Sequence, residues 1–381
     1  MLTRRDILKV GALSAVSLPE LQAEEALRSD KAVIWVWLSG GATQVETFDP
    51  KPNGLADMQS QTGSITQHST GISMGFDFQK LIHQHKNLCV VRSFSHSNSS
   101  HRTASHWVNT GYNNPNNTPQ SPQLHPSRGS IISAIYGPNH SNGMPTYVQS
   151  QTIQGGGPSW LGSQFQAYSA NGEGVVNLSP RTPSERLAER KSLLEGLDNF
   201  RGGLDDTWPE LRKQSFDLLT GQAAKAFKWE TDAMASAYDA QDNSYGRNVL
   251  LARRLVESGT KFVSVQFPGW DMHSNIAKSM GTTAPRLDKY LSLLIEDLGQ
   301  KGMSKDVMVI CAGEFGRTPK INANGGRDHW SKLCPLLIAG GDYEMGRVIG
   351  ESDKNATEPK SKPIGPQDIT ATIFDHFGID A

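Results

Sequence analysis

Short runs of apolar residues recur along the chain, and most of them are followed by glycine or by polar residues. They predict buried strands at residues 32–38, 88–91, 145–148, 262–267, 307–312 and 335–339. Because successive residues in these runs are apolar, neither face of such a strand is suited to water. This pattern is typical of a mostly parallel sheet that is covered on both sides.

Helical periodicity fills the segments between the runs. Apolar side chains form one stripe within residues 245–257 and another within residues 285–298. Residues 181–200 and 210–238 have a more polar helical pattern and predict a helical insertion near residues 181–240. Helices that alternate with buried strands predict an α/β fold, arranged as a three-layer sandwich around the mostly parallel sheet.

Residues 93–130 do not follow this scheme. They are rich in Ser, Asn, His, Pro and Thr and have little apolar periodicity. A stretch of this length is typical of a functional loop or a flexible insertion. We expect one short helix within residues 96–112.

The histidines of this segment, His96, His101 and His106, are spaced five residues apart. On a helix that spacing separates neighbouring side chains by about 140°, so the three cannot all bind one ion. Hydroxyl groups lie among them, and His101 and Thr103, together with Arg317 later in the chain, are the candidate catalytic residues. A hydroxyl in an exposed loop without a catalytic role is the alternative.

Four polar clusters lie next to predicted strands, where open α/β sheets place their ligand sites. The first follows residues 32–38 and contains Gly40, Gly41, Glu46 and Asp49. Paired glycines permit a tight turn and the close approach of an anion to peptide N–H groups. A turn that binds nothing is the alternative.

The second cluster follows residues 262–267 and contains Asp271 and His273. Side chains two residues apart in an extended segment project to the same side, so both are able to reach one ion. A helix-capping aspartate beside a solvated histidine is the alternative.

The third cluster, Glu314 with Arg317, follows residues 307–312. Glu314 stands where a metal ligand or a general base would stand, and Arg317 is able to pair with it or to clamp an oxyanion. The fourth cluster contains Arg327, Asp328 and His329. For this last cluster a salt-bridged turn is the alternative.

Together the clusters predict a metal site. Carboxylates and imidazoles at successive strand ends favour a divalent zinc, manganese, calcium or magnesium ion. Such an ion polarises an ester oxygen or lowers the pKa of a water molecule. The glycine backbone and Arg317 or Arg327 would hold the anionic part of a substrate.

Charge and composition exclude other classes of partner. The 381 residues include 37 Lys or Arg and 38 Asp or Glu, which gives a net charge of −1. This balance provides no field for charge-driven binding of nucleic acid or an anionic membrane. No run approaches the roughly 20 apolar residues of a membrane-spanning helix. The three cysteines lie in or beside apolar segments, which predicts core packing rather than disulfides.

The N-terminus has the pattern of an export signal. Arg4 and Arg5 precede a short, weakly apolar stretch, which is typical of a twin-arginine (Tat) signal over residues 1–23. The alternative is a basic first turn of an ordinary helix. The signal predicts recognition by the Tat export machinery and a periplasmic or secreted protein, with residues 24–381 as one domain.

An ordered series of motifs runs through these segments. They are Arg4-Arg5, Gly40-Gly41, Thr47-Phe48-Asp49-Pro50-Lys51-Pro52, Trp270-Asp271-Met272-His273, Glu314-Phe315-Gly316-Arg317-Thr318-Pro319 and Gly326-Arg327-Asp328-His329-Trp330. The series resembles domain-of-unknown-function family 1501 over residues 31–377. That family is exported and is similar in fold to the sulfatase and alkaline phosphatase superfamily. The resemblance implies a metal site at the strand ends that serves phosphate or sulfate ester hydrolysis.

The resemblance also implies roles for single residues. Asp271 and His273 resemble the paired metal ligands after a central strand, and His329 resembles a late single histidine ligand. Glu314 stands where an Asp-His pair usually supplies a second metal. Gly40, Gly41, Arg327 and Asp328 are the candidate substrate-binding residues.

The sequence departs from the superfamily pattern at two points. Gly40 and Gly41 follow the first strand where the superfamily has its first acidic ligand, and Glu46 and Asp49 are displaced beyond it. One metal is therefore expected rather than two. The Cys-x-Pro-x-Arg signature is missing, so a formylglycine sulfatase is not expected and no nucleophile is identified.

These patterns predict an exported, metal-dependent hydrolase of phosphate or sulfate esters. Its substrate would be an anionic small molecule or a polysaccharide ester. The alternative is a catalytically degenerate superfamily member that binds glycans or envelope partners without turnover.

Overall fold

The computed structural model describes residues 30–114, 122–171, 178, 183–200, 215–219 and 223–379. The signal predicted at residues 1–23 lies outside these residues. Among them, no helix is both long and apolar enough to cross a membrane.

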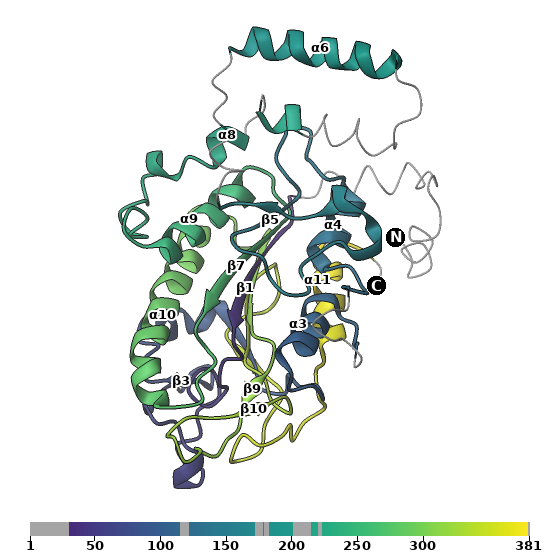
Figure 1. The fold of residues 1–381 in the computed structure, drawn as a ribbon. Helices are drawn as coiled ribbons and strands as arrows, with labels where there is room; N and C mark the ends of the chain where they lie inside the picture. Colours follow the sequence, from purple (N-terminus) through teal and green to yellow (C-terminus); the bar gives the residue numbers. More distant parts are fainter. Residues whose placement is uncertain are drawn as a thin grey trace.

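An eight-stranded sheet forms the centre of the molecule (Figure 1), with strands in the order β12-β4-β11-β8-β1-β7-β5-β6. All neighbours pair in parallel except β11, which is antiparallel to both β4 and β8. The strands are β1 Ala32–Ser39, β4 Leu88–Val91, β5 Tyr147–Gln149, β6 Tyr168–Ser169, β7 Phe262–Pro268, β8 Val307–Ala312, β11 Leu336–Gly340 and β12 Arg347–Ile349.

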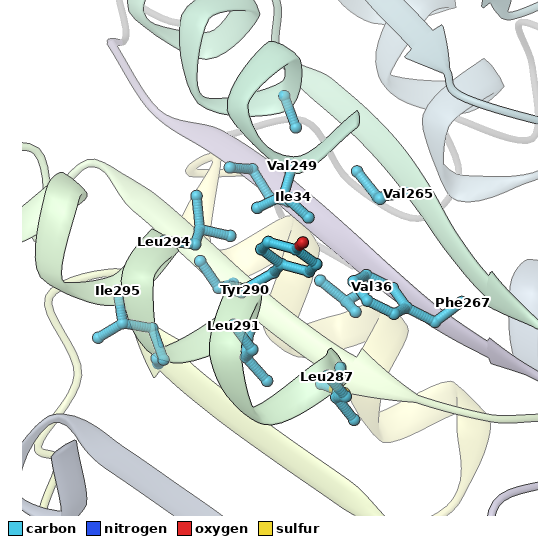
Figure 2. Packing of buried hydrophobic residues seen from close by; sticks show 14 of the residues in the cluster. Ile34, Val36, Val249, Val265, Phe267, Leu287, Tyr290, Leu291, Leu294 and Ile295 are labelled. Carbon is cyan, nitrogen blue, oxygen red and sulfur yellow. The ribbon is translucent and has the colours of Figure 1, made fainter. Parts of the chain in front are cut away.

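Helices cover both faces of this sheet. Strand β1 sends Ile34, Val36 and Leu38 into one hydrophobic cluster and Val33 and Trp35 into another on the opposite face. Figure 2 shows the first cluster, where residues of α9 (Ser244–Glu257) and α10 (Ile276–Gln300) pack on β1 and β7. The second cluster includes residues of α3 (His101–Thr110), α4 (Arg128–Tyr136) and α11 (Pro366–His376). The predicted three-layer α/β sandwich is confirmed.

The six predicted strands correspond to β1, β4, β5, β7, β8 and β11, with ends that differ by at most two residues. Apolar runs locate these strands because each is buried on both faces. The two short antiparallel pairs, β2 (Ser64–Gln67) with β3 (Ile72–Gly75) and β9 (Gly316–Arg317) with β10 (His329–Trp330), lack such runs and were not predicted. The three cysteines are free and buried, as expected.

Helix α10 begins at Ile276, nine residues before the predicted start, and contains Pro285 in its interior. Its buried stripe continues backwards through Ala284, Met280 and Ile276 at helical spacing. Proline removes one backbone donor and normally marks a helix boundary, which explains the late predicted start. The carbonyl that loses its donor belongs to Gly281, which is exposed and accessible to water.

The predicted helical insertion differs from the structure in its second half. Residues 181–200 were predicted as a helix, and α6 spans Ser184–Phe200. The second predicted helix, over residues 210–238, is wrong for residues 227–238, which form turns and a short 3₁₀ segment after α8 (Ala223–Ala226). Asp232 explains part of this, because its carboxylate accepts a hydrogen bond from the backbone of Met234 at 2.9 Å and so competes with helix formation.

Asp232 also anchors these turns to helix α9. Its Oδ2 lies 2.7 Å from Arg253 Nη2 and 2.6 Å from Arg254 Nη1. Burial alone would raise the pKa of Asp232, but hydrogen bonds from Arg253, from the Met234 backbone and from Arg254 lower its pKa to about 2. The carboxylate therefore stabilises the fold whenever it is ionised.

We predict that Asp232→Asn lowers the free energy of unfolding at neutral pH by about 1–3 kcal/mol, because Arg253 loses a buried acceptor. The wild-type contribution is fully present above about pH 4 and is lost as the pH falls toward 2, so the two proteins should converge in acid. Urea unfolding between pH 7 and pH 2 measures this. An equal difference at every pH would contradict it.

Candidate metal centre

Three polar clusters meet because their strands are neighbours. Strand β1 pairs in parallel with β7 and with β8, and Ser39 lies opposite Pro268 while Trp37 lies opposite Ala312. The loops that follow these strands therefore leave the same edge of the sheet. The pairing of β9 with β10 places His329 opposite Arg317 and brings the fourth cluster to this edge.

Three imidazoles surround the carboxylate of Asp271. His273 Nε2 lies 2.9 Å and His329 Nε2 lies 3.3 Å from Asp271 Oδ1, and His101 Nε2 lies 3.4 Å from Asp271 Oδ2. The Nε2 atoms of His273 and His329 are 3.1 Å apart. His101 comes from the first turn of α3, so one histidine of the irregular segment joins the residues at the strand ends.

The opposite nitrogen of each ring is held by an acceptor. Nδ1 of His101 lies 2.7 Å from Glu314 Oε1, Nδ1 of His273 lies 2.9 Å from Asp328 Oδ1, and Nδ1 of His329 lies 2.9 Å from the carbonyl of Ser99. Because carboxylates and carbonyls only accept, each Nδ1 carries a proton. In the neutral form of each ring, the lone pair of Nε2 is directed toward Asp271.

A divalent cation placed between these atoms would be coordinated by the Nε2 lone pairs and by the carboxylate. The three atoms Asp271 Oδ1, His273 Nε2 and His329 Nε2 are separated by 2.9, 3.1 and 3.3 Å. Two ligands of a tetrahedral zinc ion, each about 2.0–2.1 Å from the metal, lie about 3.3 Å apart. Histidine ligands with Nδ1 bound to a carboxylate or carbonyl are also typical of metal sites. The donors present therefore fit a divalent metal.

Electrostatics favour the metal-binding form of Asp271 and of His329 and oppose it at His101. Burial would raise the pKa of Asp271, but the hydrogen bond and charge of Arg317 lower it to about 2. Burial and the charge of Arg317 lower the pKa of His329, which favours its neutral ring. The hydrogen bond to Glu314 raises the pKa of His101 despite partial burial. The side chains of Asp271 and His273 are 48% and 45% exposed, so the site is open to solvent.

Arg317, the predicted oxyanion clamp, is fully enclosed and has no free donor. Its Nε donates to the carbonyl of Gly41 at 2.8 Å, and Nη2 donates to the carbonyl of Gly40 and to Asp271 Oδ1. Its Nη1 lies 3.3 Å from His273 Nε2 and 3.2 Å from the carbonyl of Arg327. A guanidinium has five N–H groups, and all five are used here. Arg317 therefore positions Asp271 and has no N–H group left to bind a substrate.

Gly40 and Gly41 make this contact possible. Their φ angles are +112° and +75°, a region that favours glycine. A side chain on Gly40 would meet the backbone of Asp271 at 2.5 Å, and one on Gly41 would meet the ring of Phe315 at 2.3 Å. The two carbonyls face Arg317, and the N–H of Gly40 donates to Glu314 at 2.9 Å. The structure thus gives this glycine pair a supporting role next to Asp271, where an anion-binding turn was predicted.

Glu314 lies behind His101 and not among the converging donors. Its Oε1 accepts from Gly40 and from His101, and the side chain is 3% exposed. Its backbone carbonyl accepts from His96 at 2.7 Å. Because the carboxylate is separated from Asp271 by the imidazole of His101, the structure places Glu314 as a group that orients a ligand, where sequence reasoning had expected a ligand.

Three further candidates lie in ion pairs away from the cluster. Arg327 Nη2 lies 2.8 Å from Glu46 Oε1, and neither side chain is exposed. Asp49 lies 2.9 Å from Lys51 and 3.1 Å from Arg92. These charges are compensated within the fold, so the structure does not bring Glu46 or Asp49 to the metal donors, nor Arg327 to a surface where a substrate binds.

Asp328 and Thr103 also differ in place from the expectation. Asp328 is exposed and accepts from His273 and, at 3.1 Å, from Asn322, so it orients a candidate ligand. Thr103 is buried, with 5% exposure, and lies two helical residues beyond His101. Residues two apart on a helix point to nearly opposite sides, so Thr103 does not face the cluster. The supporting groups of Ser99 and Asn322 were missed, because a backbone carbonyl and a loop amide carry no motif.

The sequence matches the family described as "Protein of unknown function (DUF1501)" over residues 30–381. No curated protein matches the chain in sequence.

Several solved structures are similar to the chain. A sulfatase from Pseudoalteromonas sp. is 12% identical, with 99% of this chain and 72% of that chain covered and a TM-score of 0.44. The lipoteichoic acid synthase LtaP from Listeria monocytogenes is 12% identical, with 100% and 79% covered and a TM-score of 0.43. A phosphonate monoester hydrolase from Silicibacter pomeroyi is 12% identical, with 91% and 73% covered and a TM-score of 0.43.

We predict that Glu46→Gln destabilises the protein by about 3 kcal/mol, because it leaves Arg327 buried without its partner charge. Thermal or urea unfolding measures the loss. The divalent metal bound per folded molecule should not change, since Glu46 lies outside the cluster. A folded Glu46→Gln protein that had lost its metal would show that Glu46 is a ligand after all.

Proposed function

This chain belongs to the DUF1501 family, and we propose that it is an exported, metal-dependent hydrolase of phosphate or sulfate esters. The observation that carries the proposal is the convergence of three imidazole Nε2 atoms on the carboxylate of Asp271 at the edge of the sheet. Sites of this composition are concentrated where parallel strands end, and they seldom arise for packing reasons alone.

Asp271, His273 and His329 would hold the metal, with His101 as a further donor. Three nitrogen donors and one carboxylate favour zinc over calcium, magnesium and manganese, which prefer oxygen ligands. When bound, the metal supplies a Lewis acid that polarises an ester oxygen or lowers the pKa of a water molecule.

The chain's own residues prepare the site for an anion. Arg317 compensates the charge of Asp271 through a direct hydrogen bond. A divalent cation held by neutral imidazoles would therefore keep its charge for an anionic ester. Asp328, the Ser99 carbonyl and Glu314 fix the three rings, so little reorganisation is needed when the ester binds.

The second candidate is a catalytically degenerate protein that binds glycans or envelope partners without turnover. It is favoured by the guanidinium of Arg317, which contacts Asp271 Oδ1 and His273 Nε2, two of the atoms that a metal would use. In that case Arg317 would serve as the permanent cation of the site, and the cluster would be structural.

We predict that His273→Ala and His329→Ala each lower bound metal from about one equivalent to below about a tenth. Elemental analysis of folded, chelator-washed and zinc-reconstituted protein measures this. His68→Ala is the matched control, because His68 is exposed and lies far along the chain from the cluster. Wild-type protein that binds no divalent metal even after reconstitution would exclude the metal centre.

The same variants separate the two candidate functions. Hydrolysis of an aryl phosphate or an aryl sulfate by the reconstituted wild type, reduced at least a hundredfold in His273→Ala and His329→Ala, supports the hydrolase. Metal binding without turnover of either ester favours the binding protein.

We further propose that residues 1–23 direct export by the Tat route, on the basis of Arg4 and Arg5 ahead of a weakly apolar stretch. Replacing both with lysine should leave the full-length precursor inside the cell, while the wild type is exported and shortened. Cell fractionation followed by N-terminal sequencing measures this. Export of the double variant at the wild-type level would contradict a Tat signal.

A further inference from the structure

One long stretch of the chain is almost free of charge. Across residues 103–172, Arg128 is the only Lys, Arg, Asp or Glu, although such residues make up 20% of the whole chain. Arg128 itself is buried, with 2% exposure. The described part of this stretch therefore exposes no Lys, Arg, Asp or Glu, and the stretch is rich in Asn, Gln and Ser.

Large apolar side chains are exposed on this stretch. Tyr112, Leu124 and Trp160 are 49%, 48% and 50% exposed, and they are three of the seven exposed large hydrophobic residues among those the structure describes. The ring of Tyr112 stacks on His125, with centroids 4.3 Å apart and an interplanar angle of 14°. We call Tyr112, Leu124, His125 and Trp160 the aromatic platform.

Gln123 joins the two segments of the aromatic platform. Its Nε2 donates to the carbonyls of His125 at 2.7 Å, Gly155 at 3.2 Å and Gly157 at 2.8 Å, and its Oε1 accepts from the N–H of Gly157 at 3.0 Å. The Ser159 hydroxyl donates to the carbonyl of Gln123 at 2.7 Å. The segments before Leu124 and before Trp160 are thus held together at one side-chain amide.

The backbone before Trp160 is strained. Ser159 has a φ angle of +52°, a conformation that residues other than glycine rarely adopt. Such conformations persist where surrounding contacts enforce them, and they cluster at binding sites. A rigid segment that exposes half of a tryptophan has already lost the conformational entropy that binding would otherwise cost.

Helix α3 connects the aromatic platform to the metal centre. His101 is its first residue and contacts Asp271, and Tyr112 follows its last residue, Thr110, by two positions. Ten helical residues span about 15 Å, so the two sites are separated by more than the width of one sugar ring. A chain of several sugars would be able to contact both.

We propose that the aromatic platform binds sugar rings of a polysaccharide whose phosphate or sulfate ester is presented to the metal centre. The second half of this statement rests on the proposed function, whereas sugar binding by the platform does not. Sugar rings have apolar C–H faces that stack on aromatic side chains, and their hydroxyls match amides and hydroxyls rather than charges.

The absence of exposed Lys or Arg favours a ligand that is recognised through its sugar rings rather than through its charges, so an ester-bearing polymer would contact the platform through its uncharged faces. Nucleic acid and anionic lipid require clustered Lys or Arg, and residues 103–172 have none that is exposed. A stable protein interface usually buries about 800 Å² on each partner with a charged or polar rim. Three exposed apolar side chains among amides and hydroxyls fit a narrower ligand better.

Affinity electrophoresis of the exported protein tests the proposal without turnover. The gels would contain a neutral glucan (laminarin), a neutral galactan (agarose), or the sulfated polymers carrageenan and dextran sulfate. We expect retardation by at least one polymer and a loss of affinity of about tenfold in Trp160→Ala and in Tyr112→Ala. Phe76→Ala is the matched control, because Phe76 is 54% exposed outside the platform.

Measurements of ester hydrolysis provide the second test of the proposal. Trp160→Ala should raise KM for an ester on the polymer that binds, with an unchanged kcat/KM for a small aryl ester. Inactivity of the wild type would remove this test and the proposed function, while retardation in the gels would still support the platform.

Three results would overturn the proposal. One is the absence of retardation by every polymer, and another is equal retardation of the wild type and both platform variants. The third is concentration-dependent self-association of the wild type, measured by light scattering and abolished in Trp160→Ala, which would make the platform a protein interface.

Discussion

The guanidinium of Arg317 holds together the part of the structure on which the candidate site depends. Its five N–H groups reach the turn after β1 at Gly40 and Gly41, the loop after β7 at Asp271 and His273, and the backbone of Arg327. The turn after β1 lies more than 200 residues before the other two segments in sequence, and only the side-by-side pairing of β1, β7 and β8 brings the strand ends within reach. A buried charge must be paired to be tolerated, so the same contacts that stabilise Arg317 also define where Asp271 lies.

The fold separates two kinds of charged group at this edge of the sheet. Glu46 with Arg327, and Asp49 with Lys51 and Arg92, are enclosed and compensated, so they stabilise the loops. Asp271 and the three imidazoles are partly exposed, and their lone pairs point at one another. Only the second group is arranged for a ligand, since the first has no unused capacity that solvent can reach.

Helix α3 connects the proposed metal centre to the proposed aromatic platform. Its first residue, His101, is one of the three imidazoles around Asp271, and Tyr112, which stacks on His125, lies just beyond its end. The irregular segment therefore has a structural reason for its composition. Asn, Gln and Ser hold loops through hydrogen bonds, as Gln123 does, where apolar residues would form a regular element.

The sequence by itself determined six of the eight strands of the sheet and the segments that carry the chemistry. Runs buried on both faces, such as residues 307–312, are legible because burial requires apolar residues at every position. Glycines and polar residues that follow or precede such runs locate the loops, because these residues are not suited to a buried strand. Asp271, His273 and His329 were identified in this way. The start of α10 was missed because Pro285 is a boundary signal that a solvent-exposed helical turn nevertheless tolerates.

Only the tertiary structure decided which charge meets which. A glutamate after a strand looks the same in sequence whether it binds a metal, orients a histidine as Glu314 does, or pairs with a buried arginine as Glu46 does. The outcome depends on the partner that strand order and loop packing bring within 3 Å. Hydrogen bonds and ion pairs are strong only when the two groups are this close. No local sequence pattern encodes which partner will be that close.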